Sequence, residues 1–433
     1  MANLTRRDVT PFMHTPGPVR SKRVLGAAAI GNVLEWYDWG AYGFLVTYIG
    51  ANFFPSGDSA ASLLLTFATF GVGFVARPFG AVALGWIGDR YGRRIALLVT
   101  LFGMTAATVS IGCIPGHGSI GKWAPFLLVA CRLLQGFSTG GELGGSLTFM
   151  IEWAPPNRRG FYGSAQQAST IGGVLLGSAL AALLNALLTF DQMDHWGWRL
   201  PFLFGGLFLP IGFWLRRQLK ESPIYLSTKQ SNAPPPTNRT SATRVLQAMC
   251  LVSAPVACQY LLFTFLPTYS VKFGGLTQTE ALWSNAIGLI FVIVFTPLMG
   301  ALSDRIGRKP LLFVAEGVFL LSAYFIFRFV SSMPGFVSIV LLQIGLGMAI
   351  ALYHGASPAA VAELFTTRER SFLLSISYSV SVALSGGFAP FLASWLIAWT
   401  GSSVAPAFYL IASVLVTGIA LIWTDESAHR PLG

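Results

Sequence analysis

The sequence is dominated by long apolar runs, each about as long as a helix needs to cross a bilayer. Twelve such runs of roughly 20 residues or more are separated by short polar or basic segments. They lie near residues 24–48, 60–88, 95–114, 123–152, 161–187, 198–216, 243–272, 281–302, 311–331, 334–363, 371–397 and 403–424. Inside a bilayer every backbone N–H and C=O must be satisfied within the spanning segment, which favours helices. The pattern predicts an all-α membrane protein with twelve transmembrane helices.

Composition excludes the soluble alternatives for a chain of 433 residues. Charged residues make up only 10% of the chain and hydrophobic residues 54%, whereas a soluble domain carries roughly 25% charged residues. So few charged side chains cannot cover a water-facing surface of this size. Disordered and fibrous proteins are excluded by the same composition.

The basic residues indicate topology rather than a nucleic-acid partner. The formal net charge is +11, but the Lys and Arg residues sit in short clusters between the apolar runs. With the N-terminus inside, 22 of the 28 Lys and Arg residues fall on the inner side, as the positive-inside rule requires. We therefore expect a multi-pass protein of a bacterial inner membrane with both termini cytoplasmic.

The polar segments divide the chain into two similar parts. Residues 1–23 are predicted to be a cytoplasmic tail, and the first apolar run is too long for a cleaved signal peptide. Residues 217–242, which contain three consecutive prolines, read as a flexible linker. We expect six-helix bundles at 24–216 and 243–424, and a second cytoplasmic tail at 425–433.

Two inner loops occur twice. The sequence GWIGDRYGRR at residues 85–94 returns as GALSDRIGRK at residues 300–309, an offset of 215. The sequence EWAPPNRR at residues 152–159 returns as ELFTTRER at residues 363–370, an offset of 211. The loops could simply retain positive charge inside, but that task does not require matched Gly, Asp and Arg positions. The repeats predict two structurally related halves.

In these motifs the sequence resembles the major facilitator superfamily, and more narrowly its metabolite:proton symporter branch. That branch includes permeases for citrate, α-ketoglutarate, shikimate and proline/betaine. The matching stretches are GNVLEWYD (31–38), RPFG (77–80), RLLQGFSTGGE (132–142), RRGFY (158–162) and WGWRLPF (196–202). The resemblance implies two pseudo-symmetric six-helix bundles that rock about a central cavity. It also implies an inner gate held by loop residues, here Asp89, Arg90, Arg93, Asp304, Arg305 and Arg308.

Five ionisable side chains lie well inside the predicted spans: Glu35, Asp38, Arg77, Arg132 and Glu142. Each would cost roughly 2.5–3.5 kcal/mol at bilayer depth, so each needs a partner or a function. At ~1.5 Å per residue, Glu35, Arg77 and Glu142 lie ~15–16 Å from the inner boundary and can meet. Asp38 and Arg132 form a possible second layer. These groups could also be static ion pairs that hold helices together.

Residue chemistry suggests how these charges are used. A guanidinium binds a carboxylate through two parallel hydrogen bonds and stays charged, so the two arginines favour a carboxylate substrate. Carboxylates near the midplane suit proton binding, with Asp38 and Glu142 favoured and Glu35 close behind. Polar residues on neighbouring spans complete the expected substrate site, although buried, hydrogen-bonded packing is the alternative for several of them: Arg77, Arg132, Tyr42, Gln135, Gln166, Gln259, Tyr260, Tyr353, His354 and Tyr378. Glu316 is expected to pair with a loop arginine.

We therefore predict a proton-coupled secondary transporter that imports a di- or tricarboxylate such as citrate or α-ketoglutarate. Proton- or sodium-coupled uptake of a zwitterionic osmolyte such as proline or betaine is the alternative, and a non-transporting membrane sensor is a lesser one. The chain has no phosphate-binding GxxxxGK[ST] loop, which argues against ATP-driven transport. We expect no enzymatic activity, cofactor, metal site or nucleic-acid partner, and a monomer in the lipid bilayer.

Overall fold

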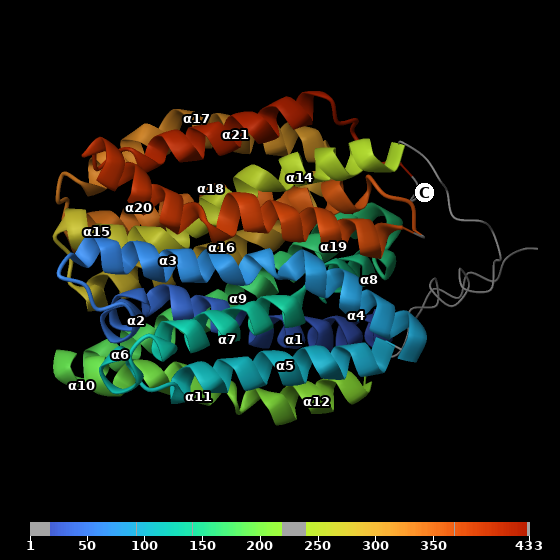
Figure 1. The fold of residues 1–433 in the computed structure, drawn as a ribbon. Helices are drawn as coiled ribbons and strands as arrows, with labels where there is room; N and C mark the ends of the chain where they lie inside the picture. Colours follow the sequence, from blue (N-terminus) through green and yellow to red (C-terminus); the bar gives the residue numbers. More distant parts are fainter. Residues whose placement is uncertain (1–17, 92, 141, 219–239, 368, 431–433) are drawn as a thin grey trace, which may run out of the picture.

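A computed structural model describes residues 18–91, 93–140, 142–218, 240–367 and 369–430, and these are helical apart from short turns and loops. Figure 1 shows the long helices running along one direction. The N-terminal half contains α1 (Pro18–Phe44), α2 (Val46–Phe53), α3 (Ser59–Val75), α4 (Arg77–Tyr91), α5 (Arg93–Cys113), α6 (His117–Ile120), α7 (Trp123–Thr139), α8 (Glu142–Glu152), α9 (Arg159–Leu187), α10 (Phe190–His195), α11 (Leu200–Gly205) and α12 (Phe208–Gln218).

The C-terminal half contains α14 (Thr240–Gln259), a π-helical segment η3 (Tyr260–Phe265), α15 (Leu266–Gly274), α16 (Gln278–Ile306), α17 (Arg308–Val330), α18 (Phe336–Ala362), α19 (Arg370–Ser381), a second π-helical segment η4 (Val382–Gly387), α20 (Ala389–Thr400) and α21 (Pro406–Ile422). Most of the predicted linker, residues 219–239, lies outside the described residues.

Each of the twelve predicted spans is helical, which confirms the twelve-helix architecture. Seven helical stretches of the described chain are long and apolar enough to cross a membrane, and two shorter apolar helices, Leu98–Cys113 and Pro406–Ile422, match the third and twelfth spans. The remaining three spans are built from two helices each: α1 with α2, α7 with α8, and α11 with α12.

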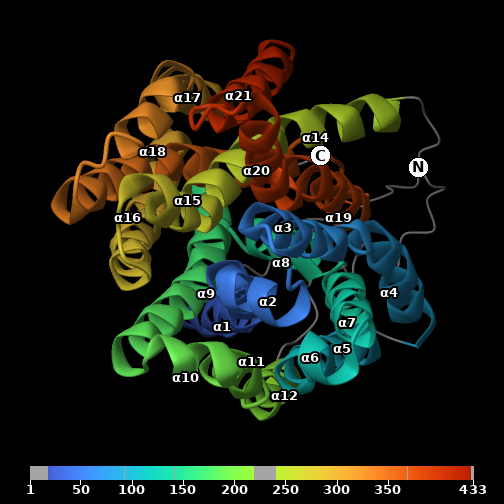
Figure 2. The same ribbon diagram turned by 60° about the vertical axis from the view of Figure 1, so that its left-hand side comes forward.

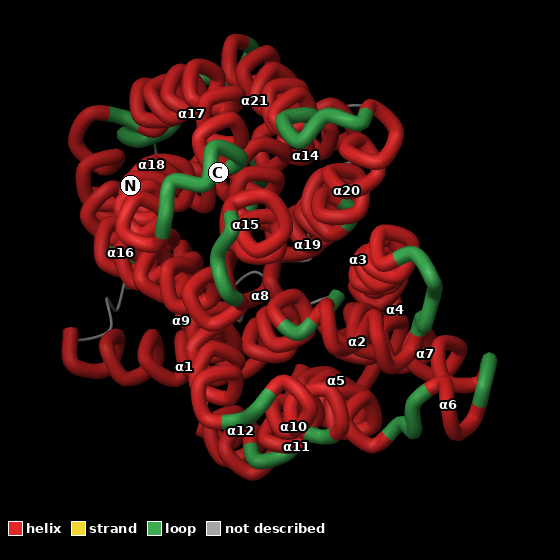
Figure 3. The backbone as a smooth tube through the Cα atoms, turned by 90° about the vertical axis from the view of Figure 1, so that its left-hand side faces the viewer, coloured by secondary structure: helices red, strands yellow, loops and turns green. Residues whose placement is uncertain are grey.

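The two halves lie side by side and meet along a long interface. In Figure 2 the N-terminal helices occupy the lower part of the view and the C-terminal helices the upper part. Figure 3, which looks at one end of the bundle, shows the same grouping. The interface is formed chiefly by α9 against α16, with α3 packed on α20 and α8 on α19. Side chains on these helices are therefore placed to line any site between the halves.

The internal repeat is visible in the packing of glycines at two helix crossings. A Cβ on Gly136 of α7 would lie 1.6 Å from the carbonyl oxygen of Gly73 on α3. A Cβ on Gly347 of α18 would lie 2.5 Å from the carbonyl oxygen of Gly288 on α16. Both pairs show the same loop offsets, 215 for the first helix and 211 for the second. Only glycine allows such close backbone contact, so the two halves repeat one helix crossing.

This crossing also establishes which residues are structural counterparts. A Cβ on Gly73 would lie 3.0 Å from the backbone oxygen of Arg132, and a Cβ on Gly288 would lie 2.9 Å from the backbone oxygen of Gln343. The two oxygens belong to residues 211 positions apart. Gln343 therefore occupies in the C-terminal half the place that Arg132 occupies in the N-terminal half.

Candidate functional site

Arg132 lies at the centre of the N-terminal half, enclosed by aromatic rings. Its side chain is 0% exposed, and its guanidinium carbon is 4.2 Å from the ring centres of both Trp39 and Tyr42. Its Nη1 donates a 2.8 Å hydrogen bond to Oε1 of Gln135, one turn along α7. Contacts between a guanidinium and aromatic faces stabilise the cation without consuming its N–H donors.

Asp38 is connected to Arg132 through two neutral side chains. Nε2 of Gln135 donates to Oγ1 of Thr108 at 2.7 Å, and the Thr108 hydroxyl donates to Oδ2 of Asp38 at 2.5 Å. Among the described side chains Asp38 and Arg132 form no direct ion pair within 4 Å. The two residues of the predicted second layer are therefore connected by a chain of hydrogen bonds and not by a salt bridge. Sequence reasoning did not identify Thr108, which is one of many threonines on apolar helices.

Arg77 and Glu35 form the predicted ion pair. Nη2 of Arg77 lies 3.8 Å from Oε1 of Glu35, and both side chains are buried. The Arg77 guanidinium carbon also lies 5.3 Å from the ring centre of Trp36 and 5.6 Å from that of Phe74. The side chain of Glu142, predicted to join this layer, lies outside the described residues.

Both arginines have N–H groups that form no hydrogen bond within the described chain. Nε and Nη1 of Arg77, and Nε and Nη2 of Arg132, are buried and have no hydrogen-bond partner among the described residues. A buried donor without a partner costs about 1–3 kcal/mol, and more when it is charged. Such donors are favourable partners for a ligand that carries hydrogen-bond acceptors and negative charge.

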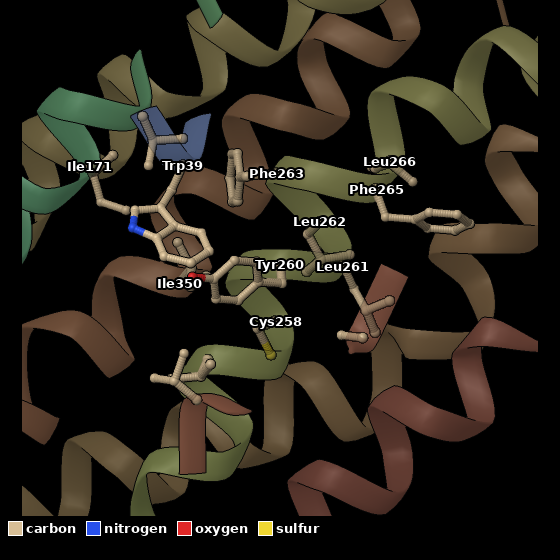
Figure 4. Packing of buried hydrophobic residues seen from close by; sticks show 14 of the residues in the cluster. Trp39, Ile171, Cys258, Tyr260, Leu261, Leu262, Phe263, Phe265, Leu266 and Ile350 are labelled. Atoms are coloured by element: carbon tan, nitrogen blue, oxygen red, sulfur yellow. The ribbon is translucent and has the colours of Figure 1, made fainter. Parts of the chain in front are cut away.

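The C-terminal half faces this layer with tyrosines. The hydroxyl of Tyr260 is close enough to both arginines to interact electrostatically, and that of Tyr378 to Arg77. The Tyr260 ring packs edge-on against Phe70 and Phe74, with ring centres 5.8 Å and 5.5 Å apart. Figure 4 shows Tyr260 beside Trp39. The arginine layer therefore lies at the interface between the halves, within reach of residues from both.

A small cavity lies between the halves beside this layer. Its volume is about 10 Å³, and it is lined by residues of both halves, including Gln166, Gln167, Pro255, Ser357 and Tyr378. A space of this size holds about one water molecule. A carboxylate ligand therefore requires the halves to separate.

The halves are joined at the end of the bundle where α4 ends and α14 and α19 begin, on the right in Figure 1. We call this the basic end because it carries Arg159, Arg308, Arg370 and Arg430. Here Nη1 of Arg159 lies 3.5 Å from Oε1 of Glu363, and Nη1 of Arg370 lies 3.7 Å from Oε1 of Glu152. Because each arginine contacts the glutamate of the other half, the repeated loops form two reciprocal ion pairs.

Asp304 adds a third connection at the basic end. Its carboxylate accepts hydrogen bonds from the backbone N–H groups of Gly160 and Phe161, at 2.8 Å and 2.9 Å, in the first turn of α9. Arg308 holds the same carboxylate at 2.8 Å and also lies 3.4 Å from Glu363. A carboxylate at a helix N-terminus satisfies free N–H groups and interacts favourably with the helix dipole. Asp304 thus caps a helix of the opposite half.

The final described segment, 423–430, also forms contacts at the basic end. Glu426 accepts hydrogen bonds from the backbone N–H groups of Arg308 and Lys309 at the start of α17, at 3.0 Å and 2.9 Å. Partial burial opposes its charged form, but these bonds, together with those from Ser427 and Ala428, hold the pKa of Glu426 below its usual value. The carbonyl oxygen of Arg430 accepts a 2.8 Å bond from Arg159 of the other half.

The structure distributes the predicted gate residues unevenly. Asp304 and Arg308 take part in the contacts at the basic end, whereas Arg305 is exposed and Arg90 lies against the rings of Trp86 and Tyr91. The side chains of two further candidates lie outside the described residues: Asp89 and Arg93. Four residues whose ion pairs join the halves at the basic end were not among the predicted gate residues, although the repeat at an offset of 211 contains them: Glu152, Arg159, Glu363 and Arg370.

The other predicted site residues fall into two groups. Tyr42, Gln135, Gln166, Tyr260 and Tyr378 are buried at or beside the arginine layer or the small cavity, and Gln259 is also buried. Tyr353 instead stacks on Phe319 of α17, with ring centres 5.4 Å apart, inside the C-terminal bundle. His354 is buried, and neither ring nitrogen has a hydrogen-bond partner in the described chain. Within that part of the chain no group of three or more His, Cys, Asp or Glu side chains is placed to hold a metal ion.

The opposite end of the bundle is closed as well. Nδ2 of Asn285 donates to Oγ of Ser178 at 3.2 Å, and the Thr279 hydroxyl donates to the backbone oxygen of Asn185 at 3.4 Å. The rings of Phe67 and Phe265 meet with centres 5.9 Å apart. These contacts are neutral, whereas those at the basic end are charged. In the described chain the halves therefore touch near both ends of the bundle.

Comparison with known proteins is consistent with this geometry. Residues 24–235 match the family described as sugar (and other) transporter, and residues 275–432 match the major facilitator superfamily. The chain is 36% identical to a citrate-proton symporter of Klebsiella pneumoniae over 404 residues, 91% of each chain. It is 35% identical to a putative proline/betaine transporter of Staphylococcus aureus (strain COL) over 413 residues, 93% of this chain and 88% of the relative.

Among solved structures, the fold is similar to that of the proton:xylose symporter XylE bound to 6-bromo-6-deoxy-D-glucose. The TM-score is 0.78, and the match covers 95% of this chain and 97% of the other. The two sequences are 16% identical, so the likeness concerns the fold alone.

Proposed function

This chain belongs to the major facilitator superfamily and is a proton-coupled transporter, and on that premise we propose that it imports an organic di- or tricarboxylate together with protons. The observation that carries the proposal is the pair of buried arginines, Arg77 and Arg132, whose free N–H donors lie between the halves. Citrate and α-ketoglutarate have the required chemistry. The similarity to a citrate-proton symporter supports the same class of substrate.

Two guanidinium groups suit a substrate with more than one carboxylate. Each planar fork can bind a carboxylate through two parallel hydrogen bonds, and it cannot lose its charge at physiological pH. Arg77 and Arg132 are packed by aromatic rings, so their orientation is fixed before the substrate arrives. Tyr260 and Tyr378, approaching from the C-terminal half, would supply further hydroxyl donors as the halves close.

Charge balance supplies the reason for proton coupling. The described layer contains two cations, Arg77 and Arg132, and two acids, Glu35 and Asp38. A polyanion added to this neutral set leaves excess negative charge at bilayer depth, which is unfavourable. Protonation of Asp38 or Glu35 removes one negative charge of that excess, and Glu142 is proposed as a further titrating group. Substrate and proton thereby stabilise one another in the closed state.

We favour Asp38 as the acid that couples proton binding to substrate binding, because hydrogen bonds connect it to an arginine. A substrate that engages Arg132 competes with the Gln135 amide for the guanidinium, and Gln135 in turn holds Thr108 against Asp38. Binding on one side of this relay therefore alters the hydrogen bonding of the acid on the other side. The coupling passes through contacts of 2.5–2.8 Å and needs no large movement.

Alternating access then requires one end to open at a time. Opening the basic end breaks the two reciprocal ion pairs and releases Asp304 from α9. Opening the other end breaks neutral contacts. We propose that the basic end is cytoplasmic, in accordance with the positive-inside rule, with both termini and the linker at 217–242 on that side. The bundle boundaries at 24–216 and 243–424 follow from the same assignment.

A second candidate substrate is a zwitterion such as proline or betaine. The aromatic rings around the arginine layer, among them Trp39, Tyr42 and Phe70, could bind a quaternary ammonium by cation–π contact. The putative proline/betaine transporter of similar sequence points the same way. Against this candidate, those rings already surround Arg132. A sensor without transport activity is the third and least supported reading.

Uptake into proteoliposomes tests these candidates directly. Purified protein is reconstituted, and the uptake of labelled citrate, α-ketoglutarate and betaine is measured with and without an imposed pH gradient. We expect concentrative uptake of a carboxylate that follows the gradient and collapses with a protonophore. Uptake of betaine alone would establish the second candidate. Binding without transport of any probe would support a sensor.

A further inference from the structure

Glu316 is a buried acid that the mechanism described so far leaves unused. It lies eight residues into α17, about 12 Å from the start of the helix. The side chain does not reach a loop arginine, as the sequence had suggested; the residue is 6% exposed, inside the C-terminal bundle. Within the described part of the chain, no Lys, Arg or His lies within 4 Å of its carboxyl oxygens.

The surroundings of Glu316 favour its neutral form. Its titratable neighbours are the Tyr353 hydroxyl from α18 and the Cys258 thiol from α14, both buried, and α21 contributes the backbone at Gly418. The Tyr353 hydroxyl lies near enough to act as a hydrogen-bond donor to the carboxyl, although neither carboxyl oxygen meets strict hydrogen-bond geometry with a described residue. An ionised carboxylate without a cation in such a place is strongly disfavoured. A carboxyl in such a place is suited to binding a proton.

The internal repeat gives this position a counterpart. With the offset of 215 that relates the loops, Glu316 corresponds to Leu101 of α5. Leu101 lines a cavity of about 20 Å³ inside the N-terminal bundle together with Glu35 and Asp38. A Cβ on Gly212 of α12 would lie 2.9 Å from Leu101, much as one on Gly418 of α21 would lie 3.9 Å from Glu316. Both halves thus place acids in the corresponding region of their own bundle, but on different helices.

We propose that Glu316 is a second proton-binding site of this carrier, in the C-terminal half, which releases and rebinds its proton during transport. The site takes a proton alone: the carboxylic acid dissociates to a carboxylate and a proton that passes to water. The proposal rests on the proposed function for its role in transport. It adds a carrier acid to those of the N-terminal half and raises the number of protons moved for each substrate.

One helix connects the Glu316 site to the arginine layer. Cys258, beside Glu316, and Tyr260, facing the arginines, are two residues apart on one helix. A π-helical segment begins at Tyr260, and Pro255 lies within the preceding α-helix. Prolines and π-helical turns are places where helices bend and rearrange. Movement of Tyr260 onto a substrate would therefore shift the wall of the Glu316 site.

Infrared spectroscopy tests protonation without any substrate. The C=O stretching band of a protonated carboxyl is compared in the wild type, Glu316→Gln and the control Glu280→Gln, all reconstituted at neutral pH. Glu280 is a water-facing acid at the start of α16. We expect a band that Glu316→Gln removes and Glu280→Gln keeps. Glu316→Asp should retain the band at a shifted frequency if the glutamine variant fails to fold. A wild-type spectrum without that band overturns the proposal.

Stoichiometry tests the role in transport. Using labelled citrate, the number of protons moved for each citrate is determined from the pH gradient that balances a citrate gradient. We expect Glu316→Gln to lower that number by one while citrate exchange across the membrane continues. An unchanged number overturns the transport role. Citrate uptake that ignores pH in the wild type would contradict the proposed function instead, and the infrared result would still stand on its own.

Discussion

The two halves of this transporter carry matching charged residues where they meet at the basic end, but they differ in the residues at the centre. At the gate, each half supplies a glutamate at the end of one helix and an arginine at the start of the next, and the pairs cross over: Arg159 with Glu363, and Arg370 with Glu152. At the centre, the N-terminal half buries Arg132, whereas the matched position of the C-terminal half is Gln343. Duplication preserved the gate and not the central charges.

The difference separates what the fold requires from what the chemistry requires. The Gly73–Gly136 crossing and the Gly288–Gly347 crossing have the same geometry, with Arg132 beside one and Gln343 beside the other. A buried arginine is therefore not needed to form the crossing. Because a buried cation costs free energy, its presence in one half alone indicates a function there, whereas the ion pairs of the basic end are formed by residues of both halves.

The largest expected effect comes from making the centre alike in both halves. Arg132→Gln gives α7 the residue that α18 has at Gln343. We expect the initial rate of labelled citrate uptake to fall about 100-fold, because removing one partner of a buried, charged contact costs about 2–5 kcal/mol. The matched control, Gln343→Met, should retain most of the activity. Equal losses in both variants would mean that the central asymmetry is structural.

The second effect concerns coupling and is confined to the N-terminal half. Asp38→Asn preserves an acceptor for Thr108 but cannot release a proton. We expect uptake driven by a pH gradient to stop accumulating citrate above equilibrium, while exchange of labelled for unlabelled citrate continues, since exchange needs no deprotonation. Proteoliposome uptake and counterflow measured side by side separate the two. Loss of exchange as well would assign Asp38 to substrate binding instead.

The third effect probes the near-symmetry of the gate. Glu363 contacts Arg159 and Arg308 and accepts a 2.6 Å bond from Ser427, and Glu152 lies 3.7 Å from Arg370. We expect Glu363→Gln and Glu152→Gln each to favour opening of the basic end, by about 1–3 kcal/mol. Spin labels at the exposed positions Asn157 and Arg305 would report the opening as a longer distance. Equal shifts in the two variants would show that the two ion pairs contribute equally to keeping the basic end closed.

The smallest effect concerns the cap at the start of α17. Glu426→Gln weakens four bonds to backbone N–H groups, and we expect about 1 kcal/mol less stability at neutral pH, as for other helix caps. Since the pKa of Glu426 is lowered in the folded state, this stabilisation is present above its unfolded value, roughly pH 4.3. It is lost as the pH falls below that value. Thermal melting of both proteins from pH 7 to pH 3.5 should show their difference shrinking.

Several features of the site were predictable because they depend on spacing along one chain. The repeat at offsets of 215 and 211 predicted two related halves, and the five charges within apolar spans indicated where the chemistry lies. The ion pair of Arg77 with Glu35 could be anticipated because depth along two helices follows from residue counts. Tyr353 was expected in the substrate site, and its ring stacks on Phe319 inside the C-terminal bundle, a direction that depth along a helix does not give.

The sequence by itself determined that this protein lies in a membrane, the number of its spans, the duplication and the set of buried charges. Those properties follow from hydropathy and spacing, which are local. Only the tertiary structure decided that the gate pairs cross between halves, that Thr108 and Gln135 separate Asp38 from Arg132, and that Glu316 lies without a cation. Partner choice depends on the rotation of each helix about its axis, and that rotation is set by packing across the whole bundle.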